Sequence, residues 1–97
     1  MNSATQAIDV RHDPEHQRFA ADVDGVEAHL DYQLRADAIR ITHTDVPAAI
    51  SGRGIGGELM RVALDHARAA GLKVTPACSY ARTYFDRHPQ YADLLAD

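Results

Sequence analysis

Four glycines interrupt the chain in the segment Ser51-Gly52-Arg53-Gly54-Ile55-Gly56-Gly57, at the point where the hydrophobic period changes from two residues to about 3.6. After this segment, the apolar residues that share one helical stripe are Ile55, Leu59, Val62, Ala63, Ala67 and Ala70. The pattern predicts a long helix from about Gly54 to Ala70, with Gly71 as its stop. Backbone N–H groups and the positive end of the helix dipole then converge at the glycines, which favours a phosphate-binding loop.

The residues before the glycines alternate with a period of two, which predicts β-strands. Asp24-Gly25 is typical of a two-residue hairpin turn, and it lies between predicted strands at 19–23 and 26–35. A short edge strand is expected at Ile8–Arg11, before the turn signal Asp13-Pro14. In the second hairpin strand, the residues expected to face the core are Val26, Ala28, Leu30, Tyr32 and Leu34.

A fourth strand follows this hairpin, so the first half of the chain is predicted to be an antiparallel meander. Ile39, Ile41 and His43 are expected on one face of this strand, and Pro47 ends it because proline withholds a backbone donor. Leu72-Lys73-Val74 is predicted as a short fifth strand. Because a helix separates it from the fourth strand, the two are expected to lie parallel in a mixed sheet.

The C-terminal part of the sequence predicts further helices. Ser79 is the expected cap of a second helix that runs to about Arg87, before Pro89, and residues 90–96 are expected to form a last helical turn. The 97 residues, 1–97, therefore form one α/β (α+β) domain, in which residues 1–6 are expected to be flexible.

Two common phosphate-binding motifs do not fit the glycine loop. Gly52, Gly54 and Gly57 spell the G-x-G-x-x-G of dinucleotide-binding folds, but no acidic residue ends the next strand to hold a ribose. That position offers Thr75-Pro76-Ala77-Cys78 instead. A P-loop is excluded too, because no Lys-Ser or Lys-Thr pair follows the glycines.

The loop resembles the acetyl-CoA pyrophosphate loop of the GNAT superfamily of acyl-CoA N-acyltransferases, which reads Arg or Gln, two residues, Gly, one residue, then Gly or Ala. Gly54 and Gly56 match the glycines, whereas Ser51 stands where Arg or Gln is expected. The flanking segments 44–47, 76–80 and 88–91 are similar to those of small single-domain GNAT-like proteins, so the resemblance spans 23–95. It implies a GNAT-like fold with a reduced acceptor surface, because a hairpin replaces the usual helices between the first strands.

The resemblance also implies a cofactor, acetyl-CoA (coenzyme A), and the residues that hold it. Asp45 and Val46 would bind pantetheine through their backbone, with the Val46 N–H polarising the thioester carbonyl. Their positions allow Arg82 and Tyr84 to flank the cofactor, and the alternative is that Tyr84-Phe85 packs the helix on the sheet. The residues expected at the pyrophosphate are Arg53, Gly54, Ile55, Gly56 and Gly57.

Three residues are candidates for catalysis of acetyl transfer to an amine. Tyr80 stands where the superfamily often places the acid that protonates the departing thiolate, and His43 is the candidate base. Cys78 at a helix start could take the acetyl group covalently, or it could be a small buried hydrophobic residue. His43 could equally be a hydrogen-bonded core histidine, because it shares a face with Ile39 and Ile41.

Composition limits the remaining classes of function. The net charge of −4 and the lack of a Lys/Arg cluster disfavour nucleic-acid binding, and no segment is apolar enough to span a membrane. Because the sequence has one cysteine and no secretory signal, we expect a cytoplasmic protein. His12 and His16 are four apart, but Pro14 between them opposes a helical metal pair, so no metal is expected.

The sequence leaves the acceptor and the assembly state open. Residues 1–50 contain four Arg and nine Asp or Glu, which favours a cationic amine or basic protein as acceptor. A monomer or weak homodimer is expected. Two alternatives to an enzyme remain: a non-catalytic CoA-binding module, and a small protein-interaction domain that docks through Glu27, His29 and Asp31 on the exposed sheet face.

Overall fold

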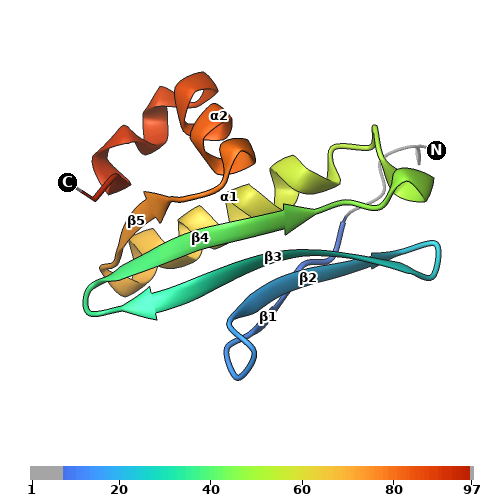
Figure 1. Cartoon of the computed structure of the whole chain (residues 1–97), viewed down its shortest axis with the longest axis horizontal. Coiled ribbons are helices and arrows are strands. Elements are labelled where there is room, and N and C mark those ends of the chain that lie inside the picture. The colour runs from blue at the N-terminus through green and yellow to red at the C-terminus, as the bar shows by residue number, and fades with distance from the viewer. Residues whose placement is uncertain (1–7, 97) are drawn as a thin grey trace.

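The computed structural model describes residues 8–96, so the segment 1–6 that was expected to be flexible lies outside the described residues. Figure 1 shows a sheet with helices packed against it. In chain order the elements are β1 (Arg11–Asp13), β2 (Arg18–Val23), β3 (Val26–Arg35), β4 (Ala38–Asp45), the 3-10 helix η1 (Ala48–Ile50), α1 (Ile55–Ala70), β5 (Lys73–Pro76), α2 (Ser79–Arg87) and the 3-10 helix η2 (Pro89–Leu94).

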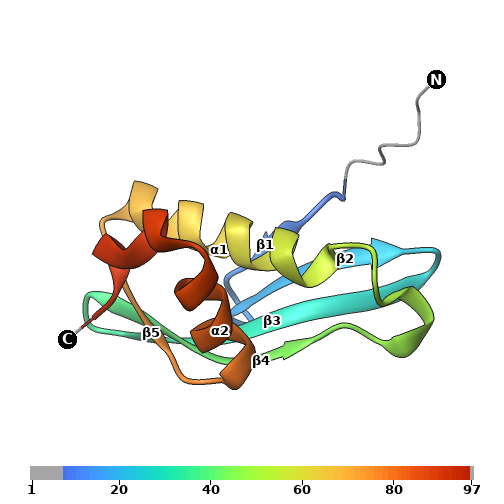
Figure 2. The ribbon, with the colours of Figure 1, turned by 90° about the horizontal axis from the view of Figure 1, so that it is seen from above.

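The sheet has the predicted topology. Its strand order is β1-β2-β3-β4-β5, in which β1 to β4 pair antiparallel and β4 pairs parallel with β5. α1 contacts β2, β3, β4 and β5, while α2 and η2 contact each other and α1 (Figures 1 and 2). The mixed α/β architecture, with an antiparallel meander followed by a helix crossover to a parallel strand, is confirmed.

The hairpin between β2 and β3 is confirmed by backbone geometry. Asp24 and Gly25 both have positive φ, 53° and 77°, as the favoured two-residue hairpin turns require. The predicted edge strand is only partly correct, because β1 is Arg11–Asp13 rather than Ile8–Arg11. Its pairing with β2 runs up to Asp13, directly before the turn at Pro14.

The core lies between α1 and one face of the sheet. Leu59, Ala63, Leu64 and Ala67 of α1 are fully buried in it. The sheet side chains in the same cluster are Phe19, Ala21, Ala28, Leu30, Tyr32, Ile39, Ile41 and Val74. Removing this apolar area from water is the main term that stabilises the fold.

One residue that the alternation places in the core is exposed. Leu34 keeps 57% of its surface exposed, whereas Leu30 on the same face of β3 is fully buried. The reason lies in the register: β2 begins at Arg18, which pairs with Asp31, so Leu34 has only β4 beside it. The prediction that Leu34 faces the core is wrong.

A β-bulge in β4 changes the direction of its last residues. Tyr32 pairs with Ile41 but Asp31 pairs with His43, so Thr42 is an extra residue on β4. The Thr42 hydroxyl donates to the Asp31 carbonyl at 3.3 Å. Past the bulge, His43 lies on the exposed face of the sheet, away from Ile41. The expectation that His43 shares the core face is therefore wrong.

The helix ends follow backbone and side-chain capping. Gly54, at φ 77°, precedes α1, and Gly71, at φ 74°, follows it, as glycines at helix ends commonly do. The cap of α2 is Cys78 rather than the expected Ser79, because the Cys78 Sγ accepts a hydrogen bond from the Ala81 N–H at 3.4 Å. Between residues 8 and 96, no helix is both long and apolar enough to cross a membrane.

Candidate functional site

The glycine loop exposes the N-terminal turn of α1. Gly52 and Gly54 have φ values of 78° and 77°, which residues with side chains rarely adopt, and the space around both is open. The first intrahelical bond of α1 runs from the Glu58 N–H to the Gly54 carbonyl at 3.1 Å. The N–H groups of the preceding turn therefore have no carbonyl partner within the helix, which is the arrangement that binds anions.

Two tyrosines of α2 face this turn. A Cβ placed on Gly56 would lie 2.6 Å from the Tyr80 Oη, and a Cβ on Gly57 would lie 4.0 Å from the Tyr84 ring. Burial raises the pKa of both phenols, and Tyr91 raises that of Tyr84 further. Both hydroxyls therefore stay protonated at neutral pH and can donate hydrogen bonds.

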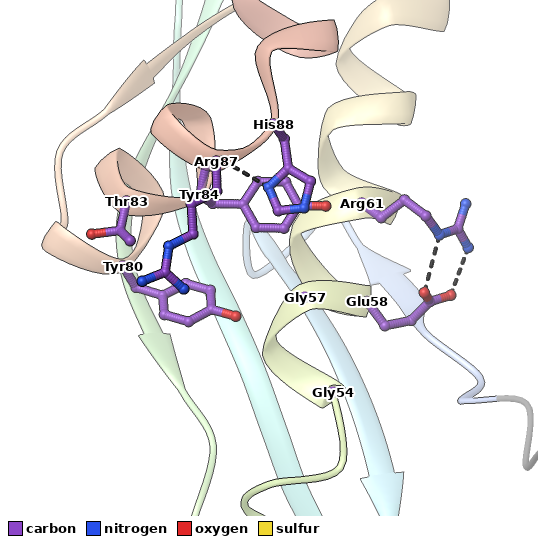
Figure 3. A pocket seen from close by; sticks show the side chains of 9 residues that line it. All are labelled: Gly54, Gly57, Glu58, Arg61, Tyr80, Thr83, Tyr84, Arg87 and His88. Carbon is purple, nitrogen blue, oxygen red and sulfur yellow. Dashed lines mark hydrogen bonds and ion pairs between the residues drawn. The ribbon is translucent and has the colours of Figure 1, made fainter.

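A cavity of about 440 Å³ opens between α1 and α2 (Figure 3). Its lining residues are Gly54, Gly57, Glu58, Arg61, Tyr80, Thr83, Tyr84, Arg87 and His88. The α2 residues among them recur at helical spacing, so one face of α2 forms one wall and the first two turns of α1 form the other. This volume lies in the range of small-molecule sites.

The two arginines of the cavity differ in their partners. Arg61 donates to Glu58 at 3.0 Å and to Asp65 at 3.1 Å, and both carboxylates help to raise the pKa of its guanidinium. Arg87 has no ion pair or hydrogen bond with another side chain within residues 8–96. The ring of Tyr84 stacks on that of His88 at 3.8 Å between centroids, and His88 Nδ1 lies 2.8 Å from the Tyr84 carbonyl oxygen.

β4 and β5 separate next to the bulge. Their pairing ends at Ile41 and Pro76, and the N–H groups of Ala77 and Cys78 both donate to the Ile41 carbonyl, at 2.9 and 3.2 Å. β4 then continues to Asp45 while the other chain segment turns into α2. The half-buried Cys78 remains near β4, because its Sγ lies 3.8 Å from the Thr44 Oγ1.

Five of the predicted site residues lie at or beside the cavity. Gly54, Gly57, Tyr80 and Tyr84 line the cavity together, and Gly56 contacts Tyr80. Three predicted residues have other surroundings. Arg53 donates to Asp24 of the hairpin at 2.8 Å, Arg82 donates to the Ala77 carbonyl at 2.8 Å, and His43 lies on the exposed sheet face with its ring 5.9 Å from that of His29.

The remaining predicted residues lie at the start of α1 and the end of β4. Ile55 is buried in the core, so only its backbone is available to a ligand. Asp45 pairs with His29 across the sheet, and Val46 packs partly against the core.

The sequence reasoning missed five lining residues: Glu58, Arg61, Thr83, Arg87 and His88. A usable signal was present in α2, since Tyr80, Thr83, Tyr84 and Arg87 share the i, i+3, i+4, i+7 spacing of one helix face. Arg61 and Glu58 have the i, i+3 spacing that is typical of an ion pair on a solvated helix face. No signal in the sequence indicates that this pair also borders a cavity.

The N-terminal histidines lie apart from the cavity. His12 Nε2 lies 2.6 Å from the Tyr32 hydroxyl, and His16 Nδ1 lies 2.8 Å from the Asp13 carboxylate. Asp13, Glu15 and His16 bring three potential ligand atoms within 4.8 Å of one another, in the exposed turn between β1 and β2. Exposed acidic groups of this kind are common in proteins without a bound ion.

Comparison with known proteins identifies the family. Residues 18–94 match the sequence profile of the family described as GCN5-related N-acetyl-transferase. The chain belongs to this family. The resemblance found in the sequence is therefore confirmed.

Individual proteins are similar to this one over nearly the whole chain. Protein NATD1 of Mus musculus is 34% identical over 93 residues, covering 91% of this chain and 84% of the mouse protein. Protein NATD1 of Xenopus tropicalis is 31% identical over 96 residues, which cover 94% of this chain and 88% of the frog protein. The solution NMR structure of a GCN5-like protein from Staphylococcus aureus superposes with a TM-score of 0.74 at 25% identity, covering 92% of this chain and 88% of that one.

Proposed function

We propose that this protein binds acetyl-CoA and transfers its acetyl group to an amine. The observation that carries the proposal is the N-terminal turn of α1, which opens into a cavity of about 440 Å³ between α1 and α2. Membership of a family that typically binds acetyl-CoA supports the same ligand.

The residues present fit a pyrophosphate group. The positive φ values of Gly52 and Gly54 leave the backbone N–H groups accessible, because no side chain stands over them. Tyr80 and Tyr84 add neutral hydroxyl donors at the same helix end. A doubly charged group bound here would be stabilised by the helix dipole and by several backbone N–H groups at once.

The end of β4 suits the pantetheine arm. Past the bulge at Thr42, the strand is no longer paired with β5, so the backbone of Asp45 and Val46 can bind a ligand as a missing strand would. In this arrangement the Val46 N–H polarises the thioester carbonyl. When bound, the cofactor supplies an activated acetyl group, and the chain supplies orientation and proton transfers.

The proton transfers have candidates in this chain. His43, exposed on the open sheet face, can accept a proton from an incoming amine. The Tyr80 hydroxyl lies against Gly56 in the turn proposed for the pyrophosphate, and the pantetheine arm separates the pyrophosphate from the sulfur. Tyr80 is therefore assigned to the pyrophosphate in this arrangement and not to the thiolate leaving group. Cys78 offers a covalent route, whose signature is an acetyl adduct on this residue in intact-protein mass spectrometry.

A non-catalytic CoA-binding module is the second candidate function. The Ser51 hydroxyl, at the loop position where the family expects Arg or Gln, donates to the Ala48 carbonyl at 3.0 Å. This position therefore adds no positive charge to the loop. A module of this kind binds the cofactor but shows no turnover with any amine.

Isothermal titration with acetyl-CoA, with NAD as the comparison ligand, tests the cofactor. We expect micromolar binding of acetyl-CoA and none of NAD. Gly54→Ala should weaken binding strongly. Gly71→Ala is the matched control, because it also has a positive φ and open surroundings but caps the other end of α1. Equal affinities in the two variants would contradict the proposed loop.

Turnover is tested separately by the release of CoA with a polyamine and with a lysine-rich peptide as acceptors. Release that depends on the amine supports the enzyme. Binding without release for either acceptor supports the module. If acetyl-CoA does not bind at all, the fold serves another purpose, such as docking a protein partner.

A further inference from the structure

We infer that Arg87 selects coenzyme A over its form without the 3′-phosphate, by binding that phosphate in the cavity between α1 and α2. This inference rests on the proposed function, because it takes the N-terminal turn of α1 as the pyrophosphate site. It goes beyond that function by assigning a specificity-determining residue to the nucleotide end of the cofactor.

The direction of the cofactor follows from the geometry. A pyrophosphate in coenzyme A has two substituents, the pantetheine arm and the phosphorylated adenosine. If the arm follows the unpaired end of β4 at Asp45 and Val46, the adenosine leaves the α1 N-terminus in another direction. In that direction the cavity extends from Gly54 and Gly57 to Arg87 and His88.

The charges of the cavity favour a phosphate near Arg87. Glu58 is the acidic group in the lining, and its carboxylate is bound by Arg61, which lowers the pKa of Glu58. Arg61 is itself held by Glu58 and Asp65. Of the two arginines that line the cavity, Arg87 is therefore the one without a carboxylate partner within residues 8–96. A guanidinium group can bind a phosphate through two parallel hydrogen bonds.

The position of Arg87 agrees with this role. Figure 3 shows its guanidinium extending back along α2 toward the Tyr80 ring, on the same side as Thr83. Thr83, one turn earlier on α2, also lines the cavity and offers a hydroxyl donor. The stacked rings of Tyr84 and His88 form a wall of the same cavity, which suits a nucleotide base.

The test compares the dissociation constants of coenzyme A and 3′-dephospho-coenzyme A by isothermal titration. We expect the native protein to bind coenzyme A about tenfold or more tightly, because hydrogen bonds to charged groups are the strong ones. Arg87→Ala should lower the affinity for coenzyme A to that for the dephospho form and leave the latter unchanged. Arg87→Lys should restore part of the preference.

Arg40→Ala is the matched control, because Arg40 is an exposed arginine on β4 that does not line the cavity. It removes the same charge and should keep the native preference. Circular dichroism melts check that each variant folds. Equal affinities of the native protein for both ligands, or an unchanged preference in Arg87→Ala, overturn the inference. Failure of both ligands to bind the native protein overturns the proposed function itself.

Discussion

The phenol of Tyr80 lies against the first turn of α1 at Gly56, where even one methyl group has no room. A Cβ on Gly56 would stand 2.6 Å from the Tyr80 Oη and 2.9 Å from its Cζ. Gly56 has ordinary helical backbone angles, since it is absent from the residues with positive φ. A side chain at this position therefore requires the Tyr80 ring to move, whereas the helix itself favours alanine over glycine.

Gly56→Ala should stabilise the native protein less than it stabilises a Tyr80→Ala variant. In the native background the added methyl group forces the exposed Tyr80 side chain to move, which offsets part of the gain in helix propensity. Without the tyrosine, alanine gains its helix propensity over glycine, up to about 1 kcal/mol. Urea unfolding of the four proteins in this double-mutant cycle measures both effects. Equal effects of Gly56→Ala in both backgrounds would contradict the proposed contact.

The stability of the fold should fall as the pH falls below about 6.5, through His12. Burial lowers the pKa of His12, and the charge of His66, whose ring lies 4.5 Å away between centroids, lowers it further, while Asp13 opposes both. The unfolded chain therefore takes up a proton at a higher pH than the folded one. By linkage, the free energy of unfolding keeps its full value above pH 6.5, the pKa of His12 in the unfolded chain. It decreases as the pH falls through the lower pKa of His12 in the folded protein.

The measurement is urea unfolding at about pH 7.5 and about pH 5.5. His12→Gln keeps a polar partner for the Tyr32 hydroxyl but does not titrate, so it should lose less stability between the two pH values than the native protein. The carboxylate of Asp13 does not interfere, because its pKa is lowered from 3.8, outside this window. Equal losses in the two proteins would remove His12 as the cause.

Cys78→Ala should lower the free energy of unfolding by about 1 kcal/mol, whereas Cys78→Ser should not. The Sγ accepts the Ala81 N–H at the start of α2, and a serine oxygen can accept the same bond. Thermal or urea unfolding of both variants measures the difference. Any loss of acetyl transfer in Cys78→Ser then reports on chemistry rather than on folding. Equal destabilisation by both substitutions would show that the cap contributes little.

The sequence predicted the order and type of the long elements because their periods are strong. The alternation over 26–35 and the helical stripe after Gly54 both match elements with buried faces, β3 and α1. Local rules also located the turn at Asp24-Gly25. Each of these features depends on residues close together in the chain, which a pattern can report.

The missed features depend on contacts between distant segments. Nothing near Thr42 marks it as a bulge, because the extra residue is defined by the register with Asp31 and Tyr32 on β3. The face of His43 was therefore mispredicted. The periodicity of α2 places Arg87 on the same helix face as Tyr80 and Tyr84, but whether this face lines a cavity depends on how α2 packs beside α1.

Leu30 and Leu34 test directly the difference between the burial that the alternation predicts and the burial that the packing of the strands produces. They occupy the same face of β3, and the alternation treats them alike. Leu30 is fully buried, so Leu30→Ala should lower the free energy of unfolding by about 2–5 kcal/mol through lost contacts and a cavity. Leu34 is 57% exposed and has no β2 neighbour, so Leu34→Ala should change it by less than about 0.5 kcal/mol. Urea unfolding of the two variants measures the contrast, and comparable losses would mean that Leu34 is covered in solution.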